Sequence, residues 1–211
     1  MLGITAALSI QEHLTRNQAI LIVAREFPGD KTPNYASPWA GAHYRPIPIT
    51  SPETEKSAGQ ARRSFAKFKQ IAANEPAAGV QRIEGVEYLQ SVASHAAYGN
   101  EAVMKDTYAH VDGFRALDPT ELPEGVTWGV RYDTVVINSP VYCACLLRKF
   151  VLRGGQTRAY TLVNLKEAFF MADNVKTVVN CSGVGFADPN SFIIRGICFF
   201  FLYIIQTAAS Y

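Results

Sequence analysis

The sequence predicts an open α/β fold in which helices pack on a largely parallel sheet. Ala19–Ala24 is a continuous apolar run and Val175–Asn180 is rich in valine, and we interpret both as buried strands. Residues 4–17 contain strong helix formers and precede the first of these runs. A helix that leads into a buried strand is half of a βαβ unit, so helices packed on a mainly parallel sheet are expected.

Composition excludes several classes of protein. The chain has 211 residues, of which 48% are hydrophobic, and 20 Lys and Arg face 18 Asp and Glu. These values exclude a disordered chain, a collagen and a coiled coil. A formal net charge of +2 also argues against nucleic acid as a partner, because phosphate binding needs an excess of basic side chains. No membrane span is predicted, since the apolar run 197–205 is far shorter than the ~20 residues required.

The middle of the chain predicts a long helix and then a less regular layer. Ser51 and Pro52 form a helix start, with Ser at the N-cap and Pro at the first helical position. Apolar residues then recur at spacings of three and four, and the basic residues among them are expected to form a solvated face. Residues 83–116 alternate over short stretches and are broken by glycines, which favours strands and loops of a second layer.

The last third returns to alternating strands and helices. The predicted elements are a strand at 126–132, a helix at 141–152 that ends at Gly154 and Gly155, a strand at 156–163, a short helix or turn at 165–171, and a buried strand at 175–180. The last strand runs directly into the small residues 181–185. An open α/β sheet forms its ligand crevice at such turns, at the carboxyl ends of its strands.

Gly3 allows two interpretations of the first helix. A dinucleotide-binding fingerprint needs a strand and two further glycines before that helix, and only Met1 and Leu2 precede Gly3. Glu26 follows roughly 20 residues later, where an acidic side chain could bind ribose hydroxyls. By themselves these residues favour a plain buried helix–strand pair over a dinucleotide site.

The cysteines are expected to pack as small buried hydrophobes in a reducing compartment. They are Cys143, Cys145, Cys181 and Cys198, and none belongs to a C-x-x-C pair or has a histidine at metal-ligand spacing. No metal site is therefore predicted.

Several short segments occur in an order that points to one family. They are Arg25-Glu26, Ala36-Ser-Pro-Trp-Ala-Gly-Ala42, Tyr132-Asp-Thr134, Asn180-Cys-Ser-Gly183, and Asp188-Pro-Asn190 with Arg195-Gly196. In this order they resemble the FAD-dependent D-amino-acid oxidase family, including its D-aspartate oxidase branch, and most closely the fungal members. The similarity extends from Gly3 to Gly196.

The resemblance implies a division of the chain. Residues 1–50 and 120–196 would form the Rossmann-like FAD-binding core, which is incomplete because its first strand is missing. Residues 51–119 would belong to an interleaved, smaller α+β substrate-domain segment. Residues 197–211 match nothing in the family and are expected to be a tail, in which 197–205 is either a buried strand or a sequence that the fold does not require.

The resemblance also implies ten contacts with FAD. Gly3 would lie at the pyrophosphate, Arg25 and Glu26 at the adenosine end, Ser37, Gly41, Ala42 and His43 along the pyrophosphate and isoalloxazine, Leu162 against the adenine, and Ser182 and Gly183 in the turn after the last strand. Small residues suit such a site because a large side chain would occupy the ligand's volume. For His43, a loop histidine without a flavin contact is an equal alternative, and Trp39 is expected to be a packing anchor.

The activity implied is oxidation of a D-amino acid by FAD and molecular oxygen, which gives an imino acid and hydrogen peroxide. The resemblance further implies a peroxisomal or cytoplasmic protein, with a homodimer as one candidate assembly. Two alternatives remain open: a non-catalytic Rossmann-like fragment, and an NAD(P)-dependent dehydrogenase of similar topology, which Glu26 would permit.

The chain departs from the family after Gly196. Family members continue into a second half that holds the substrate carboxylate, and this sequence does not. We therefore expect an incomplete or misassembled chain, truncated at both ends, with weak flavin retention and impaired activity, and we assign no catalytic residue.

Overall fold

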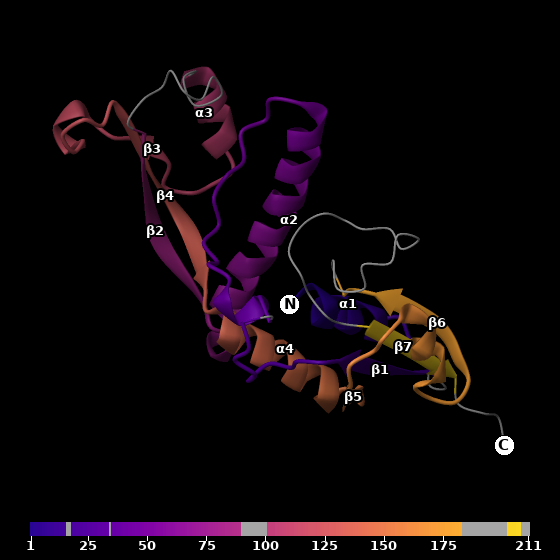
Figure 1. Ribbon diagram of the computed structural model, residues 1–211. Coiled ribbons are helices and arrows are strands. Elements are labelled where there is room, and N and C mark those ends of the chain that lie inside the picture. Colours follow the sequence, from indigo (N-terminus) through magenta and orange to yellow (C-terminus); the bar gives the residue numbers. More distant parts are fainter. Residues whose placement is uncertain (16–17, 34, 90–100, 183–201, 208–211) are drawn as a thin grey trace. The chain divides into compact units, whose positions relative to one another are not determined.

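A computed structural model describes residues 1–15, 18–33, 35–89, 101–182 and 202–207 (Figure 1). The chain forms two compact units, Met1–Ala40 with Ser139–Tyr211 and Gly41–Asn138. These boundaries lie at Ala40 and Asn138, whereas the family resemblance put the functional division after residues 50 and 119. The assignment of one part to FAD and the other to substrate stays a prediction.

The first unit contains a four-stranded sheet with the order β5-β1-β7-β6 (Figure 1). The strands are β1 (Gln18–Ala24), β5 (Gln156–Ala159), β6 (Val175–Asn180) and β7 (Leu202–Thr207). β1 pairs with β5 in parallel, and β7 pairs with both β1 and β6 in the antiparallel sense. The predicted α/β class is confirmed, and the sheet is mixed.

Strand β1 is the centre of the first unit's core. Ile20 to Ala24 are all buried, which confirms the prediction from the apolar run. Helix α1 (Leu2–Gln11) buries Gly3, Ile4, Ala7 and Leu8, and helix α4 (Ser139–Leu152) buries a further face that includes Phe150. The two helices are joined by a hydrogen bond from the Gln11 side chain to the Phe150 carbonyl at 3.1 Å.

Helix α1 is shorter than residues 4–17. It ends at Gln11, and the Gln18 side chain accepts hydrogen bonds from the backbone and hydroxyl of Thr15, both at 3.1 Å. Such side-chain bonds compete with continuation of the helix. The C-terminal boundary of α4 agrees with the sequence, because Gly154 adopts a φ of 84° and Gly155 lies under the Phe150 ring, where a Cβ would come within 2.3 Å.

Two predictions for the last third need correction. Strand β5 ends at Ala159 rather than Val163, and a 3-10 helix, η4 (Leu165–Phe170), follows it. Strand β6 exists as predicted but is not buried, since its residues are half-buried or exposed. The reason is its place at one end of the described sheet, where it has a strand on one side only.

The second unit contains a three-stranded antiparallel sheet, β2-β4-β3. Its strands are β2 (Val80–Leu89), β3 (Arg115–Ala116) and β4 (Trp128–Ile137). Helix α2 (Pro52–Asn74) packs on this sheet and buries Ala58, Phe65 and Ile71. Strand β4 begins near the predicted strand at 126–132 and extends to Ile137.

The start of α2 confirms the N-cap prediction. The Ser51 hydroxyl accepts from the Thr54 backbone N–H at 3.3 Å, and the Thr54 hydroxyl accepts from the Ser51 N–H at 2.8 Å. This reciprocal pair satisfies two N–H groups that the helix itself cannot satisfy. Helix α3 (Glu101–Tyr108) was not predicted, because residues 83–116 were expected to form only strands and loops. Three short 3-10 helices complete the described elements: η1 (Ser37–Trp39), η2 (Pro76–Ala78) and η3 (Pro119–Glu121).

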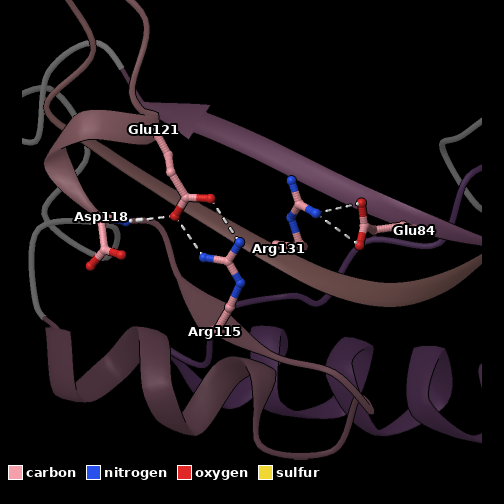
Figure 2. A network of polar contacts seen from close by, with 5 residues as sticks. All are labelled: Glu84, Arg115, Asp118, Glu121 and Arg131. Atoms are coloured by element: carbon pink, nitrogen blue, oxygen red, sulfur yellow. Dashed lines mark hydrogen bonds and ion pairs between the residues drawn. The ribbon is translucent and has the colours of Figure 1, made fainter.

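Ion pairs offset the like charges that β3 and β4 place opposite each other (Figure 2). Arg115 and Arg131 lie directly opposite each other, an arrangement of like charges that is unfavourable alone. Arg115 donates to both oxygens of Glu121, at 2.7 and 2.8 Å, and Arg131 pairs with Glu84 on β2 at 3.1 Å. The hydrogen bonds from Arg115, with one from the Asp118 N–H, lower the pKa of Glu121 to about 2. Each arginine is thus neutralised by its own carboxylate.

A largely buried carboxylate lies in the second unit. The side chain of Glu87, 10% exposed, accepts hydrogen bonds from the Tyr132 hydroxyl and from Arg45, whose Nε is 3.0 Å away. Burial alone would raise the pKa of Glu87, but the hydrogen bonds from Arg45 and Tyr132 outweigh it and hold the pKa below 4.5. Both carboxylate oxygens therefore have donors.

We predict that Glu87→Gln lowers the free energy of unfolding by about 1.5–3 kcal/mol at pH 7, because hydrogen bonds to a charged acceptor are lost. The folded-state pKa is depressed, so this contribution is present above the unfolded pKa and disappears as the pH falls through the folded one. Urea denaturation between pH 7 and pH 3 should show the two proteins converging below about pH 4.5.

Glu124→Gln, at an exposed position of the same unit, is the matched control and should change stability by about 0.5 kcal/mol or less. A difference between Glu87→Gln and the parent that stays constant with pH would contradict the prediction.

Candidate functional site

The carboxyl ends of three strands meet at one edge of the first unit's sheet. β1 and β5 are parallel, and β1 and β6 point the same way because β7 is antiparallel to both. Ala24, Ala159 and Asn180 therefore end at this edge. Ligands of open α/β sheets bind outside such ends. Five of the residues that the family resemblance singled out, Arg25, Glu26, Ser37, Leu162 and Ser182, follow these strand ends in the chain.

Glu26 is the polar residue at this edge that most clearly indicates ligand binding. It is only 5% exposed, and its Oε1 accepts hydrogen bonds from Arg25 Nε at 2.6 Å and from the Thr32 hydroxyl at 3.3 Å. Its Oε2 is buried and has no hydrogen-bond partner among the described residues. A buried carboxylate oxygen without a donor is costly, so this atom fits a hydroxyl group of a ligand.

Ser37 and Gly3 link the loop after β1 to the beginning of α1. Ser37 is fully buried, and its hydroxyl accepts a hydrogen bond from the Met1 amino group at 2.9 Å. Gly3 is buried in the first turn of α1, where the first backbone N–H groups have no acceptor within the helix. Unsatisfied N–H groups at a helix start favour an anion such as a phosphate.

Leu162 and Ser182 lie near the other two strand ends. Leu162 is partly buried and packs against Leu21 and Val23 of β1. Ser182 is buried, and its N–H and hydroxyl both donate to the Asn180 side chain, at 2.9 and 2.6 Å. The Asn180 side chain thus holds the second residue after β6, and the turn itself stays a prediction because Gly183 lies outside the described residues.

Gly41, Ala42 and His43 belong to the second unit. The Ala42 carbonyl accepts from the Ile137 N–H at 2.7 Å, and His43 forms an isolated bridge with Val136, so this segment extends the sheet beside β4. The His43 ring stacks on that of Tyr132, with centroids 6.4 Å apart, and a Cβ on Gly41 would meet nothing within 4 Å. It therefore remains a prediction that the ten residues implied by the family resemblance share one FAD site.

Trp39 is not a packing anchor, contrary to the prediction. Its side chain is 62% exposed, and its indole N–H donates to the Thr32 carbonyl at 3.2 Å. It lines a cavity of about 190 Å³ with Pro38, Pro140 and Cys143, among others. This volume is below the range of roughly 300–1,000 Å³ typical of ligand sites, so the cavity alone cannot hold a dinucleotide.

Two further residues at this edge were missed by sequence reasoning. Thr32 hydrogen-bonds Glu26, and Tyr35 is 2% exposed with a hydroxyl that has no partner in the described part of the chain. Burial is the main cause that raises the pKa of Tyr35. Both residues lie in a turn-rich stretch of the sequence. The feature that could have identified Tyr35 is its aromatic side chain directly before the Ala-Ser-Pro-Trp segment.

The described cysteines differ in their burial. Cys143 and Cys145 are buried, as predicted, whereas Cys181 is only half-buried, and Cys198 lies outside the described residues. Burial raises the pKa of the Cys143 and Cys181 thiols. Within the described ranges, no three His, Cys, Asp or Glu side chains are grouped to hold a metal ion. No helix in those ranges has the length and apolar character to cross a membrane.

Comparison with known proteins identifies relatives along almost the whole chain. The family model described as FAD dependent oxidoreductase matches residues 1–198. A D-aspartate oxidase from Talaromyces thermophilus is 39% identical over 93% of this chain and 58% of its own length. A D-amino-acid oxidase from Fusarium vanettenii is 28% identical over 88% of this chain and 52% of its own length.

A D-amino-acid oxidase from Schizosaccharomyces pombe is 23% identical over 93% of this chain and 55% of its own length. The chain thus spans little more than half the length of these curated relatives. The family match nevertheless covers β1, β5 and β6, the carboxyl edge and Glu26 described above. On this evidence the chain belongs to the family of FAD dependent oxidoreductases that includes the D-amino-acid oxidases.

Proposed function

We propose that this chain is the flavin-binding part of a D-amino-acid oxidase. The observation that carries the proposal is the buried Oε2 of Glu26, which has no described donor and follows the strand where a dinucleotide's ribose would lie. Membership of an FAD dependent family supports FAD over a pyridine nucleotide as the ligand.

The proposed contacts follow the chemistry of each side chain. Glu26 accepts hydrogen bonds from the adenosine ribose, and Arg25, which pairs with Glu26, orients that carboxylate. Gly3 lets the pyrophosphate approach the start of α1, and Leu162 offers an apolar surface to the adenine. The remaining proposed contacts are Ser37, Gly41, Ala42, His43, Ser182 and Gly183.

FAD held by these residues would supply the two-electron chemistry of the reaction, with the α-carbon hydride of a D-amino acid as the source of electrons and molecular oxygen as the final acceptor. The products are an imino acid and hydrogen peroxide, and water converts the imino acid to a 2-oxo acid and ammonia. The described residues contribute by fixing the cofactor's adenosine end, and no catalytic residue is assigned. Retention of FAD is expected to be weak, and the activity of this chain impaired.

The names of the relatives suggest which substrates to test. D-Aspartate is the first substrate to test, since the relative that is 39% identical is named a D-aspartate oxidase. A neutral D-amino acid is the alternative suggested by the names of the other two relatives.

We further propose a peroxisomal or cytoplasmic location, to which the free thiols Cys143, Cys145 and Cys181 are suited, and a homodimer as the assembly.

We predict that Glu26→Gln weakens FAD binding about tenfold or more, because a charged acceptor for ribose hydroxyls is replaced by a neutral amide. Quenching of flavin fluorescence during titration of the purified chain measures this directly, without any turnover. Glu12→Gln is the control, since Glu12 pairs with Arg153 on the exposed surface, and it should leave FAD binding unchanged. Equal affinities of the parent and Glu26→Gln proteins would exclude the proposed role of Glu26.

A second prediction concerns turnover. Protein loaded with FAD should produce peroxide from D-aspartate or a neutral D-amino acid, and none from the L-enantiomer, at a rate below that of a complete relative. A coupled peroxidase assay measures this, with flavin absorbance recorded in the same sample. Flavin absorbance without peroxide would favour the non-catalytic alternative, and a protein that takes up no flavin would contradict the proposed cofactor.

A further inference from the structure

A larger cavity lies at the other end of strand β1 from Glu26. It has a volume of about 450 Å³ and is formed by the end of α1, the start of β1 and the residues that follow α4. This volume falls within the range of roughly 300–1,000 Å³ typical of ligand sites. Because β1 begins at Gln18 and ends at Ala24, the cavity belongs to the amino edge of the sheet, away from the candidate site at the carboxyl edge.

The side chain of Gln11 gives this cavity an acceptor that has no donor. Gln11 lines the cavity, and its Nε2 donates to the Phe150 carbonyl at 3.1 Å, which orients the amide. Its Oε1 is buried and accepts no hydrogen bond from any residue that the structure describes. A buried acceptor without a donor is costly, so a ligand in this cavity is expected to carry an N–H or O–H group.

Gln18 lines the same cavity but differs from Gln11 in this respect. Its Oε1 accepts hydrogen bonds from the backbone N–H and the hydroxyl of Thr15, both at 3.1 Å. The unmet need for a donor is therefore specific to Gln11.

The charges around the cavity favour a cation. α1 ends at Gln11 and α4 at Leu152, so the negative ends of two helix dipoles lie beside it. The last turn of α1 has no basic residue, and its C-cap is Glu12, a carboxylate at the end of a helix where a positive charge would be stabilising.

The ion pair at the cavity satisfies Glu12 only in part. Among the described residues that line the cavity, Glu12 and Arg153 are the charged ones. They pair at 3.4 Å, and their side chains are 60% and 49% exposed, so the pair contributes little and can be displaced.

We propose that this cavity binds a small aliphatic amine in its protonated form. The ammonium group donates to Gln11 Oε1 and lies near the Glu12 carboxylate, while the hydrocarbon part contacts Leu14, Ala19 and Ile20. A free amino acid is a poorer ligand, because its carboxylate would be repelled by Glu12. Amine binding does not require FAD.

The test uses n-butylammonium as the probe and the purified chain without added FAD. Backbone amide NMR signals are followed during the titration, and those of Gln11, Gln18 and Arg153 should shift and saturate. Two ligands of similar size are the controls: n-butanol has a donor without charge, and tetramethylammonium has charge without a donor. Butylammonium should bind about fivefold or more tightly than either.

Three variants give changes of different sign. Glu12→Gln should weaken the binding of butylammonium about threefold, because the carboxylate charge is lost, and Arg153→Gln should strengthen it about twofold, because a competing cation is removed. Asp173→Asn, an exposed acid of the same unit outside the cavity, is the control and should change nothing. A merely structural role of the ion pair would weaken binding in both of the first two variants.

Gln11→Leu tests the unpartnered acceptor itself. It should reduce the preference for butylammonium over tetramethylammonium to about twofold or less. The ratio is measured within one protein, so a general loss of stability does not affect it, and circular dichroism confirms that each variant is folded.

Several results would overturn the proposal. They are binding of n-butanol as tight as that of butylammonium, equal affinities of the parent, Glu12→Gln and Arg153→Gln proteins, and NMR shifts confined to residues outside the cavity.

FAD titration of the same proteins separates amine binding from the proposed function. Glu26→Gln should weaken FAD binding and leave butylammonium binding unchanged, and Glu12→Gln should do the reverse. Butylammonium binding by a chain that takes up no FAD would support the amine site and count against the proposed cofactor. FAD binding without butylammonium binding would support the cofactor and overturn the amine site.

Discussion

Strand β1 is buried from Ile20 to Ala24 and has a hydrogen-bonded neighbour on each side, so its register is fixed. A slip by one residue would turn its side chains to the opposite faces and break the pairing with β5 and β7 together. Because the register of β1 is fixed, the residues that follow it have a fixed position at the carboxyl edge of the sheet. Glu26 is held there, and the proposed function depends on that placement.

Glu26 and Glu87 show how differently carboxylates with little exposure can be used. Both oxygens of Glu87 have donors, from Tyr132 and Arg45, so that group strengthens the second unit without any ligand. Glu26 has donors on one oxygen only. A half-satisfied buried carboxylate reduces stability until a donor arrives, which is the signature expected of a binding residue rather than a structural one.

The sequence predicted correctly those elements that depend on residues close together in the chain. The apolar run of β1 and the Ser51 cap of α2 depend on neighbouring residues and were predicted correctly. The exposure of β6 and the direction of β7 depend on which strands pair, and pairing over long sequence separations leaves no trace in a short window. The same holds for Trp39, whose exposure depends on how the loop after β1 folds, and for the bond between Thr32 and Glu26.

The central claim, that the free oxygen of Glu26 receives a ribose hydroxyl, is tested most directly by changing the ligand rather than the protein. The measurement compares the Kd of the chain for FAD with its Kd for an analogue that lacks both hydroxyls on the adenosine ribose. We predict that the analogue binds about tenfold or more weakly to the parent chain and that Glu26→Gln removes most of this difference. Equal binding of FAD and the analogue to the parent chain would contradict the claim.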